Sequence, residues 1–401
     1  MHKDQGEVVE IAEDLLSHRF GGSQQLGEVE VLAGSGNALV LRARVANSPF
    51  LQHRSVVVKY NPETGHPVED AALLREVVAY QFTTSLPEEV RPGPVLLAHD
   101  IEQRIVVLTD AGDGSTLIDV LDDADDERRI QVIRSLGTEL GRMHAGTAER
   151  EAHFDALLHR QLRNFSHYGE HQTVRDAAIR ESIFLGLDIL RSAGIEPPAE
   201  FVQQAEYASS VLLAGSERAF TPFDLSPDNI IVSKKIDFLD YEWAGFRNVG
   251  FDVASVISGF PQFLFSRPIS DAEVDILINA WSREVQETWP HLGREESQHE
   301  LITASMIGWA LASIATMYAG GLEELVVLTQ TERSPLSPED AAWLRAAEEG
   351  PFSEDEELLR RDLYETFEAL SRFTARGRGD DARAISDFSA QLVRRLMQPE
   401  D

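Results

Sequence analysis

The stretch TPFDLSPDNIIVSKKIDFLDYEWAGF, residues 221–246, decides the fold of this chain. Pro227 keeps its first part out of a helix, so a loop is expected there, leading into a strand at 230–232. A second apolar run over 236–239 follows two lysines and predicts a second strand. Two short strands joined by a polar turn are typical of a hairpin.

Three polar side chains mark the open end of this hairpin. If the strands pair about Lys234 and Lys235, Asn229 falls opposite Asp240. An amide oxygen and a carboxylate are hard ligands that suit Mg²⁺, which keeps room for water and phosphate oxygens. Asp224, one loop-width away, is placed to accept a proton from a substrate hydroxyl. Asp and Asn beside a proline are also ordinary loop and cap residues, so the spacing by itself leaves both interpretations open.

A glycine-containing segment lies upstream, between two predicted strands. In LAGSGNALVLRARV, residues 32–45, Gly34, Ser35 and Gly36 are small enough to let backbone amides approach phosphate oxygens closely. Taken alone, however, the segment favours an ordinary hairpin turn that contains glycine.

One lysine stands out because the chain has so few. Of 36 basic residues four are lysines, and Lys59 lies near the end of the apolar strand expected at 55–60. A buried ammonium in such a place is costly unless it is paired or reaches solvent. Glu76 interrupts the apolar face of the next helix, expected within 67–82, and offers that pair. Together the two residues predict an ion pair that holds phosphate.

The composition narrows the functional classes. The chain has 401 residues, 43% of them hydrophobic, a formal net charge of −32 and no cysteine. This charge makes nucleic acid and anionic membranes poor partners, and the lack of cysteine excludes disulfides and thiolate metal sites. No targeting signal is evident, and the apolar run near 306–321 fits a buried helix, so a cytoplasmic location is expected. The sequence leaves the oligomeric state open.

The periodicity divides the chain into two regions of different texture. After an amphipathic opening helix, β-rich runs and one helix fill the chain up to about residue 108. The rest is mostly helical apart from the hairpin, with a late linker expected near 375–384. We therefore predict an α+β protein with a β-rich region at 1–108 and a helical region at 109–401.

The order of these features resembles a known superfamily. A glycine loop, a strand lysine, a helix glutamate, D-x-x-x-x-N and a later aspartate follow one another as in protein-kinase-like proteins, and more narrowly as in the aminoglycoside phosphotransferase and choline kinase group. The resemblance spans about 28–260, and its most specific part is DLSPDNIIV…FLDYEWAGFRNVGFDVAS at 224–255. There Asp240-Tyr241-Glu242, Gly245 and Asp252-Val253-Ala254 match the group's Asp-Trp-Glu, Gly and Asp-Leu-Ala positions. The resemblance implies a two-lobed fold, with an ATP-binding N-lobe and a C-lobe that carries the catalytic loop and the acceptor pocket.

The resemblance also implies roles for single residues of the phosphate site. Asp224 would be the catalytic base, and Asn229 and Asp240 would hold Mg²⁺. Lys59, oriented by Glu76, would contact the α- and β-phosphates of ATP or another nucleoside triphosphate.

Two further segments take nucleotide-binding roles by the same resemblance. The loop at Gly34, Ser35 and Gly36 would cover the phosphates. The backbone around Leu108 and Asp110 would form the hinge that bonds the adenine.

The sequence departs from the group next to the catalytic position. Pro222 and Phe223 stand where the group has His-Gly, which stiffens and crowds the loop before Asp224. Asp228 replaces a small residue and is expected to cap the turn rather than to hold a second cation. Asp252 is expected to brace the catalytic loop without binding metal.

The predicted function is an ATP- and Mg²⁺-dependent phosphotransferase that acts on a hydroxyl of a small molecule. The acceptor classes are an aminoglycoside-like antibiotic, an amino-alcohol and a sugar-like metabolite, with a cationic acceptor modestly favoured. The altered loop entry supports an alternative, a catalytically impaired kinase-like protein that binds nucleotide or regulates a partner. Nucleotidyl transfer is a third hypothesis, which Lys59, Glu76 and Asp224 argue against. The sequence names neither the acceptor nor the role of the chain after about residue 330.

Overall fold

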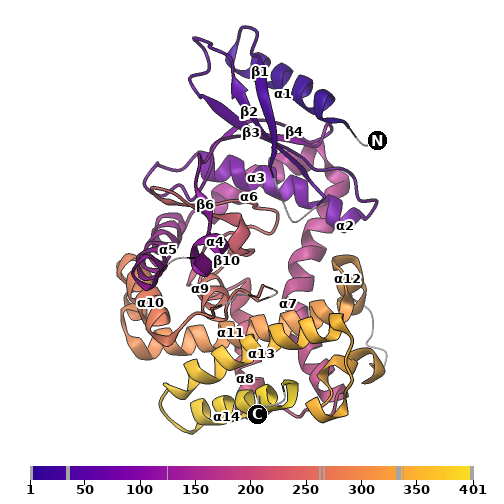
Figure 1. Ribbon diagram of the computed structural model, residues 1–401, viewed down its shortest axis with the longest axis vertical. Coiled ribbons are helices and arrows are strands. Elements are labelled where there is room, and N and C mark those ends of the chain that lie inside the picture. Colours follow the sequence, from indigo (N-terminus) through magenta and orange to yellow (C-terminus); the bar gives the residue numbers. More distant parts are fainter. Residues whose placement is uncertain are drawn as a thin grey trace.

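The chain begins with a helix and a five-stranded antiparallel sheet, and the rest of it is mostly helical (Figure 1). The computed structural model describes residues 3–32, 37–123, 125–261, 263–264, 267–330, 336 and 338–397. The sheet contains β1 (Leu26–Leu32), β2 (Leu39–Val45), β3 (Ser55–Tyr60), β4 (Leu96–Asp100) and β5 (Ile105–Thr109), in the spatial order β1-β2-β3-β5-β4. The loop predicted at Gly34, Ser35 and Gly36 lies outside the described residues.

Helices cover both faces of this sheet. On one face α1 (Gln5–Phe20) begins with a capping box between Asp4 and Glu7 and buries its apolar stripe against the strands. On the other face lie α2 (Pro67–Asp70) and α3 (Ala72–Thr84). A single helix over 67–82 was predicted, but the backbone breaks at Ala71. Helix α3 carries Glu76 on the side that faces Lys59 of β3.

The remaining helices follow in the order α4 (Leu117–Asp123), α5 (Asp126–Thr147), α6 (Glu151–Asn164), α7 (Gly169–Ser192), α8 (Ala199–Leu212), α9 (Gly250–Ile257), α10 (Asp271–Val285), α11 (Glu295–Ala319), α12 (Leu322–Gln330), α13 (Glu354–Ala375) and α14 (Asp380–Leu396). Between them, β6 (Ser115–Thr116), β8 (Ile230–Val232) and β9 (Ile236–Phe238) form a small sheet, and β7 (Arg218–Thr221) pairs with β10 (Gly245–Asn248). This mixture of elements confirms the α+β class.

The predicted hairpin is present as β8 and β9, but its register differs by one residue from the prediction. Ile231 pairs with Asp237, so Asn229 lies opposite Leu239 rather than opposite Asp240. The Leu239 N–H donates to the Asn229 carbonyl at 2.8 Å. The turn is tighter than expected, because it is closed by a hydrogen bond from the Ser233 N–H to the Lys235 carbonyl. Asp240 therefore lies just beyond the strand, in a left-handed conformation with φ 55°.

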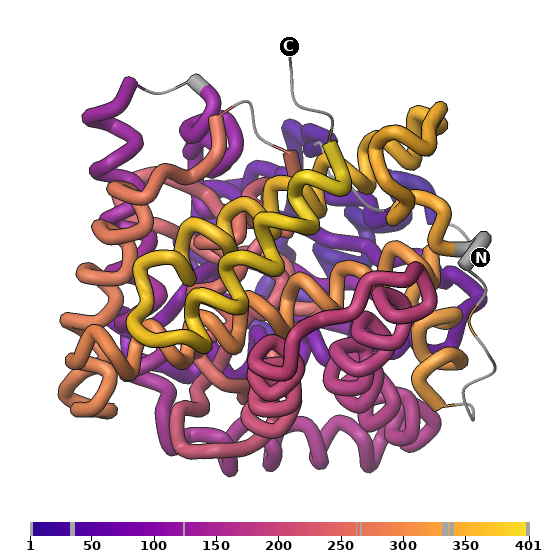
Figure 2. Tube along the Cα trace, turned by 90° about the horizontal axis from the view of Figure 1, so that it is seen from below, coloured from indigo at the N-terminus to yellow at the C-terminus, as the bar shows by residue number. Residues whose placement is uncertain are grey.

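Helix α11 forms the centre of the helical region. By length and composition it could cross a membrane, yet 72% of its most apolar 18-residue window is buried inside the protein. This burial agrees with the core helix predicted near 306–321. Below it, α13 and α14 lie side by side at the end of the molecule opposite the sheet (Figures 1 and 2). Of the linker predicted near 375–384, only residues 376–379 form a turn, because α14 already begins at Asp380.

A close crossing fixes α7 against α11. Gly186 of α7 faces the backbone of Leu311, and a Cβ at this glycine would lie 2.2 Å from the Leu311 carbonyl oxygen. A backbone neighbour cannot move away as a flexible side chain can. The crossing therefore requires glycine, and it sets the position of every residue on α7.

We expect Gly186→Ala to lower the free energy of unfolding by about 1–3 kcal/mol, since the methyl group must push the two helices apart. Gly169→Ala, at the start of the same helix, is the matched control because a Cβ there meets no atom within 4 Å. Urea unfolding measures both, and equal stabilities of the two variants would contradict the close crossing.

Candidate functional site

Five residues that the sequence singled out line one cavity of about 390 Å³ between the sheet and the hairpin. Lys59 comes from β3, Glu76 from α3, and Asp240 from the segment after β9. Asp224 and Asn229 come from the loop and the short 3₁₀ turn that precede β8. Segments that are far apart in the sequence thus bring these five side chains together.

Lys59 is the cation at the centre of the cavity. Its Nζ lies 2.9 Å from Glu76 Oε1 and 2.8 Å from Asp240 Oδ1, and the residue is 9% exposed. The second Glu76 oxygen accepts a hydrogen bond from Asn61 Nδ2 at 3.3 Å. Burial acts to lower the pKa of Lys59, but the two carboxylates outweigh it and raise the pKa above its ordinary value. Lys59 is therefore held charged and fixed in position.

Asp224 is half-buried and carries a perturbed carboxyl group. The Ser226 N–H donates to its Oδ1 at 3.1 Å, which holds the carboxylate toward the cavity. Burial raises the pKa of Asp224 to about 6, and the charges of Asp240 and Glu242 act in the same direction. A carboxylate with such a pKa is well suited to take up a proton near neutral pH.

The residue before Asp224 has a backbone conformation that usually requires glycine. Phe223 has φ 68°, in the left-handed region, at the position where the resemblance places a glycine. Its ring stacks on Trp309, with 4.8 Å between the centroids, and the Arg247 guanidinium lies 4.6 Å from its centroid. The chain thus keeps the glycine-like bend and holds it by aromatic packing.

Comparison of two substitutions tests this strain. Phe223→Ala loses the ring contacts, at a cost of about 3–5 kcal/mol. Phe223→Gly loses the same contacts but relieves a left-handed backbone that costs about 1 kcal/mol. The glycine variant is therefore expected to be the more stable of the two by that difference in urea unfolding. An alanine variant of equal or greater stability would show that Phe223 is not strained.

A buried polar chain lies behind this loop. Asp252, on α9, is 3.1 Å from His144 Nε2, and Trp281 Nε1–H donates to His144 Nδ1 at 3.0 Å. Because Nδ1 accepts, Nε2 carries the proton and donates to Asp252. Burial raises the pKa of Asp252, although His144 acts to lower it. Asp252 does not line the cavity wall.

Leu108 and Asp110, whose backbone was expected to bond the nucleotide base, do not line this cavity. Leu108 is buried in the core, and Asp110 lines a separate hollow of about 670 Å³. The Asp110 carboxylate accepts hydrogen bonds from Arg42 Nη2 at 3.1 Å, from Ser55 Oγ at 2.7 Å and from the Gly112 N–H at 2.9 Å. Burial acts to raise the pKa of Asp110, but these partners lower it below its ordinary value. The side chain of Asp110 is thus occupied, and its role toward a nucleotide stays a prediction.

The donor set of the cavity fits Mg²⁺. Asn229 and Asp240 offer an amide and a carboxylate oxygen in the same cavity, and Mg²⁺ commonly takes its other ligands from water and phosphate. Among the described residues, no group of three or more His, Cys, Asp or Glu side chains is placed to hold a metal alone. Asp228 Oδ1 is buried and has no hydrogen-bond partner among the described residues. The turn cap that the sequence predicted for Asp228 is therefore not formed.

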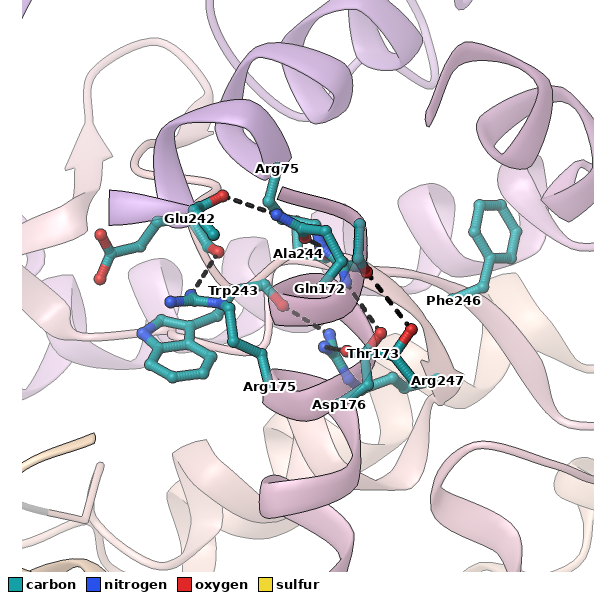
Figure 3. Close-up of polar contacts among 12 residues, drawn as sticks. Arg75, Gln172, Thr173, Arg175, Asp176, Glu242, Trp243, Ala244, Phe246 and Arg247 are labelled. Atoms are coloured by element: carbon teal, nitrogen blue, oxygen red, sulfur yellow. Dashed lines mark hydrogen bonds and ion pairs between the residues drawn. The ribbon is translucent and has the colours of Figure 1, made fainter. Parts of the chain in front are cut away.

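Arg175 of α7, and Glu242 and Trp243 of the segment between β9 and β10, also line the cavity. Their side chains point to the same side in Figure 3. The sequence matched Glu242 to a family position, but it gave no role to Arg175 or Trp243. Glu242 and Trp243 lie two and three residues after Asp240, so the motif itself is the signal that could have found Trp243. Nothing in the charge-rich sequence around Arg175 distinguishes it from a surface residue.

No protein-family model matches this sequence, and no curated protein sequence matches it either. The structure is similar to that of a choline kinase from Streptococcus pneumoniae, at 14% identity and a TM-score of 0.44, over 90% of this chain and 98% of that chain. It is similar to an aminoglycoside phosphotransferase with ADP bound, at 12% identity and a TM-score of 0.44, over 84% of this chain and 99% of that chain.

A choline/ethanolamine kinase family protein from Mesorhizobium loti is similar at 13% identity and a TM-score of 0.45, over 95% of this chain and 99% of that chain. Both groups that the motifs resemble are therefore found among similar solved structures. Likenesses of this size assign no activity, which rests on the side chains of the cavity.

Proposed function

We propose that this protein is a kinase-like phosphotransferase that uses Mg²⁺-ATP to phosphorylate a hydroxyl of a small molecule. One observation carries the proposal. A buried lysine, held by Glu76 and Asp240, lies in the same cavity as the half-buried Asp224 and the amide of Asn229. A fixed cation, oxygen ligands and a carboxylate base are the parts that phosphoryl transfer requires.

In the proposed reaction, Asp224 accepts the proton of the acceptor hydroxyl as its oxygen bonds to the γ-phosphorus. The bond between that phosphorus and the bridging oxygen of ADP breaks, and ADP leaves with the electron pair. The products are a phosphate monoester, ADP and the proton held by Asp224. Since little covalent chemistry falls to the protein, its contribution is positioning and charge neutralisation.

Lys59 supplies a fixed positive charge to the phosphates in this proposal, and Glu76 keeps its ammonium in place. Mg²⁺, held by Asn229 and Asp240, would neutralise further phosphate charge. Asp240 contacts Lys59 in the described structure, so its carboxylate connects the lysine with the metal-binding residues.

The alternative of a catalytically impaired nucleotide-binding protein was raised by Pro222 and Phe223. Phe223 keeps the left-handed backbone that glycine would provide, and Asp224 still reaches the cavity. These two observations favour catalysis over a purely regulatory role. Two lobes meeting at about residue 108, and a cytoplasmic location, remain part of the proposal.

A screen of hydroxylated small molecules tests the proposal. The protein with Mg²⁺-ATP is expected to add the mass of one phosphate to its acceptor and to release ADP in equal amount. ADP release without an acceptor product would indicate hydrolysis only. Transfer of a nucleotidyl group, seen as the corresponding larger mass gain, would contradict the proposed orientation of ATP.

A further inference from the structure

Three buried arginines lie close together on α3, α7 and β10, and two of them share one carboxylate. Arg75, Arg175 and Arg247 are 4%, 2% and 2% exposed. Asp176 accepts from Arg75 Nη2 and from Arg247 Nη2, each at 2.8 Å (Figure 3). One carboxylate therefore serves two guanidinium groups, and the third has to find other partners.

Arg175 is the arginine that remains without a carboxylate. Its Nη1 donates to the Val68 carbonyl at 3.1 Å and its Nη2 to the Glu242 carbonyl at 3.0 Å. Over the ranges that the structure describes, no carboxylate forms an ion pair with it. A guanidinium has five N–H groups, so three of them are left for another acceptor.

The surroundings of Arg175 keep it charged and point it into the cavity. Burial lowers the pKa of Arg175 to about 10, although the charge of Glu242 acts to raise it, so Arg175 is still protonated at neutral pH. The Trp243 ring packs 4.0 Å from the guanidinium carbon and fixes its plane. Arg175 lines the same cavity as Asp224.

We propose that Arg175 binds an anionic group, a carboxylate or a phosphate, on the hydroxylated acceptor. A buried cation without a direct ion pair is costly, and although the charge of Glu242 favours Arg175 from nearby, a bound anion would lower that cost further through two parallel hydrogen bonds. The inference rests on the proposed function, because it places this anion in the same cavity as the base that accepts the hydroxyl proton.

Glu242 restricts what lies beside the anion. Its carboxylate points to the same side as the Arg175 guanidinium (Figure 3). An ammonium group on the acceptor would be attracted there. A small hydroxy acid that also carries an amine would match both Arg175 and Glu242.

A matched set of small alcohols tests the inference with Mg²⁺-ATP. L-Serine, D-glycerate and glycerol 3-phosphate carry an anion, glycerol is neutral and 2-aminoethanol is cationic. We expect phosphate gain to be fastest for an anionic member, and the carboxylates and the phosphate ester tell the two anions apart. Arg175→Gln should raise the KM of that member about 10- to 100-fold, the effect of losing hydrogen bonds between charged groups, with the KM for ATP unchanged.

Two further variants serve as controls for this test. Arg180→Gln, an exposed arginine of the same helix that bonds Glu181, should behave as wild type. If Arg175→Gln does not fold, Arg175→Lys decides, since a lysine keeps the charge without the paired N–H groups and should still raise the KM several-fold.

The outcomes separate the two proposals. Preference for glycerol or 2-aminoethanol, with an unchanged KM in the Arg175 variants, overturns the anion site. Phosphate gain by no member of the set, while Mg²⁺-ATP still raises the melting temperature, overturns it as well. If Mg²⁺-ATP does not bind at all, the proposed function itself fails.

Discussion

Asp224→Asn is expected to lower kcat for phosphate transfer about 10²- to 10⁴-fold, because the amide cannot accept the proton of the acceptor hydroxyl. The affinity for Mg²⁺-ATP should change little, since Lys59, Asn229 and Asp240 are all retained. Single-turnover assays with saturating ATP measure the loss, and nucleotide titration measures the affinity. Wild-type rates in the variant would remove Asp224 from the role of base.

The same variant is expected to be more stable than wild type at alkaline pH. Because folding raises the pKa of Asp224 from 3.8 to about 6, the charged carboxylate disfavours the folded state. This penalty is absent below pH 3.8, grows as the pH rises and is complete above about pH 6. Urea unfolding at pH 8 should show a gain of about 1–3 kcal/mol, falling to about half at pH 5. A gain independent of pH would mean that the charge is not its cause.

Lys59→Met is expected to lower kcat/KM for ATP about 10²- to 10³-fold, the typical loss when one fixed group that stabilises transition-state charge is removed. The substitution keeps the length of the side chain but takes away its charge. It also leaves Glu76 and Asp240 without their shared cation, so the unliganded protein should be less stable.

Lys234→Met provides the control for this prediction. Lys234 is one of the four lysines, but it lies in the exposed turn between β8 and β9 and does not line the cavity. In steady-state kinetics, kcat/KM for ATP should match wild type in Lys234→Met and should be about 10²- to 10³-fold lower in Lys59→Met. Equal rates for the Lys59 variant and wild type would contradict a phosphate-binding role.

Much of the site could be predicted from short sequence patterns, because these depend on the chemistry of a few neighbouring residues. A lone lysine in an apolar strand and a glutamate in an apolar helix face predicted the pair that the structure forms at 2.9 Å. The hairpin at residues 230–238 followed from two apolar runs around a polar turn. Its register was wrong because register depends on the hydrogen bonds of the turn, which residue types alone do not determine.

The parts that were missed depend on contacts between distant segments. Strand β4 is only five residues long and ends in His99 and Asp100, so it carries no alternating pattern. It forms a strand because its backbone pairs with β5. The role proposed for Arg175 depends on the structure, in which Asp176 forms ion pairs with two other arginines and none with Arg175. No pattern within α7 contains that information.

The melting temperature of the protein with and without Mg²⁺-ATP tests the central claim most directly. A ligand that binds only the folded state stabilises it by about 2.7 kcal/mol at one hundred times its Kd. We predict a rise in the melting temperature that grows with nucleotide concentration, requires Mg²⁺ and is weakened in Asp240→Ala. A wild-type melting temperature that no nucleotide changes would contradict the assignment of this cavity to a phosphotransferase.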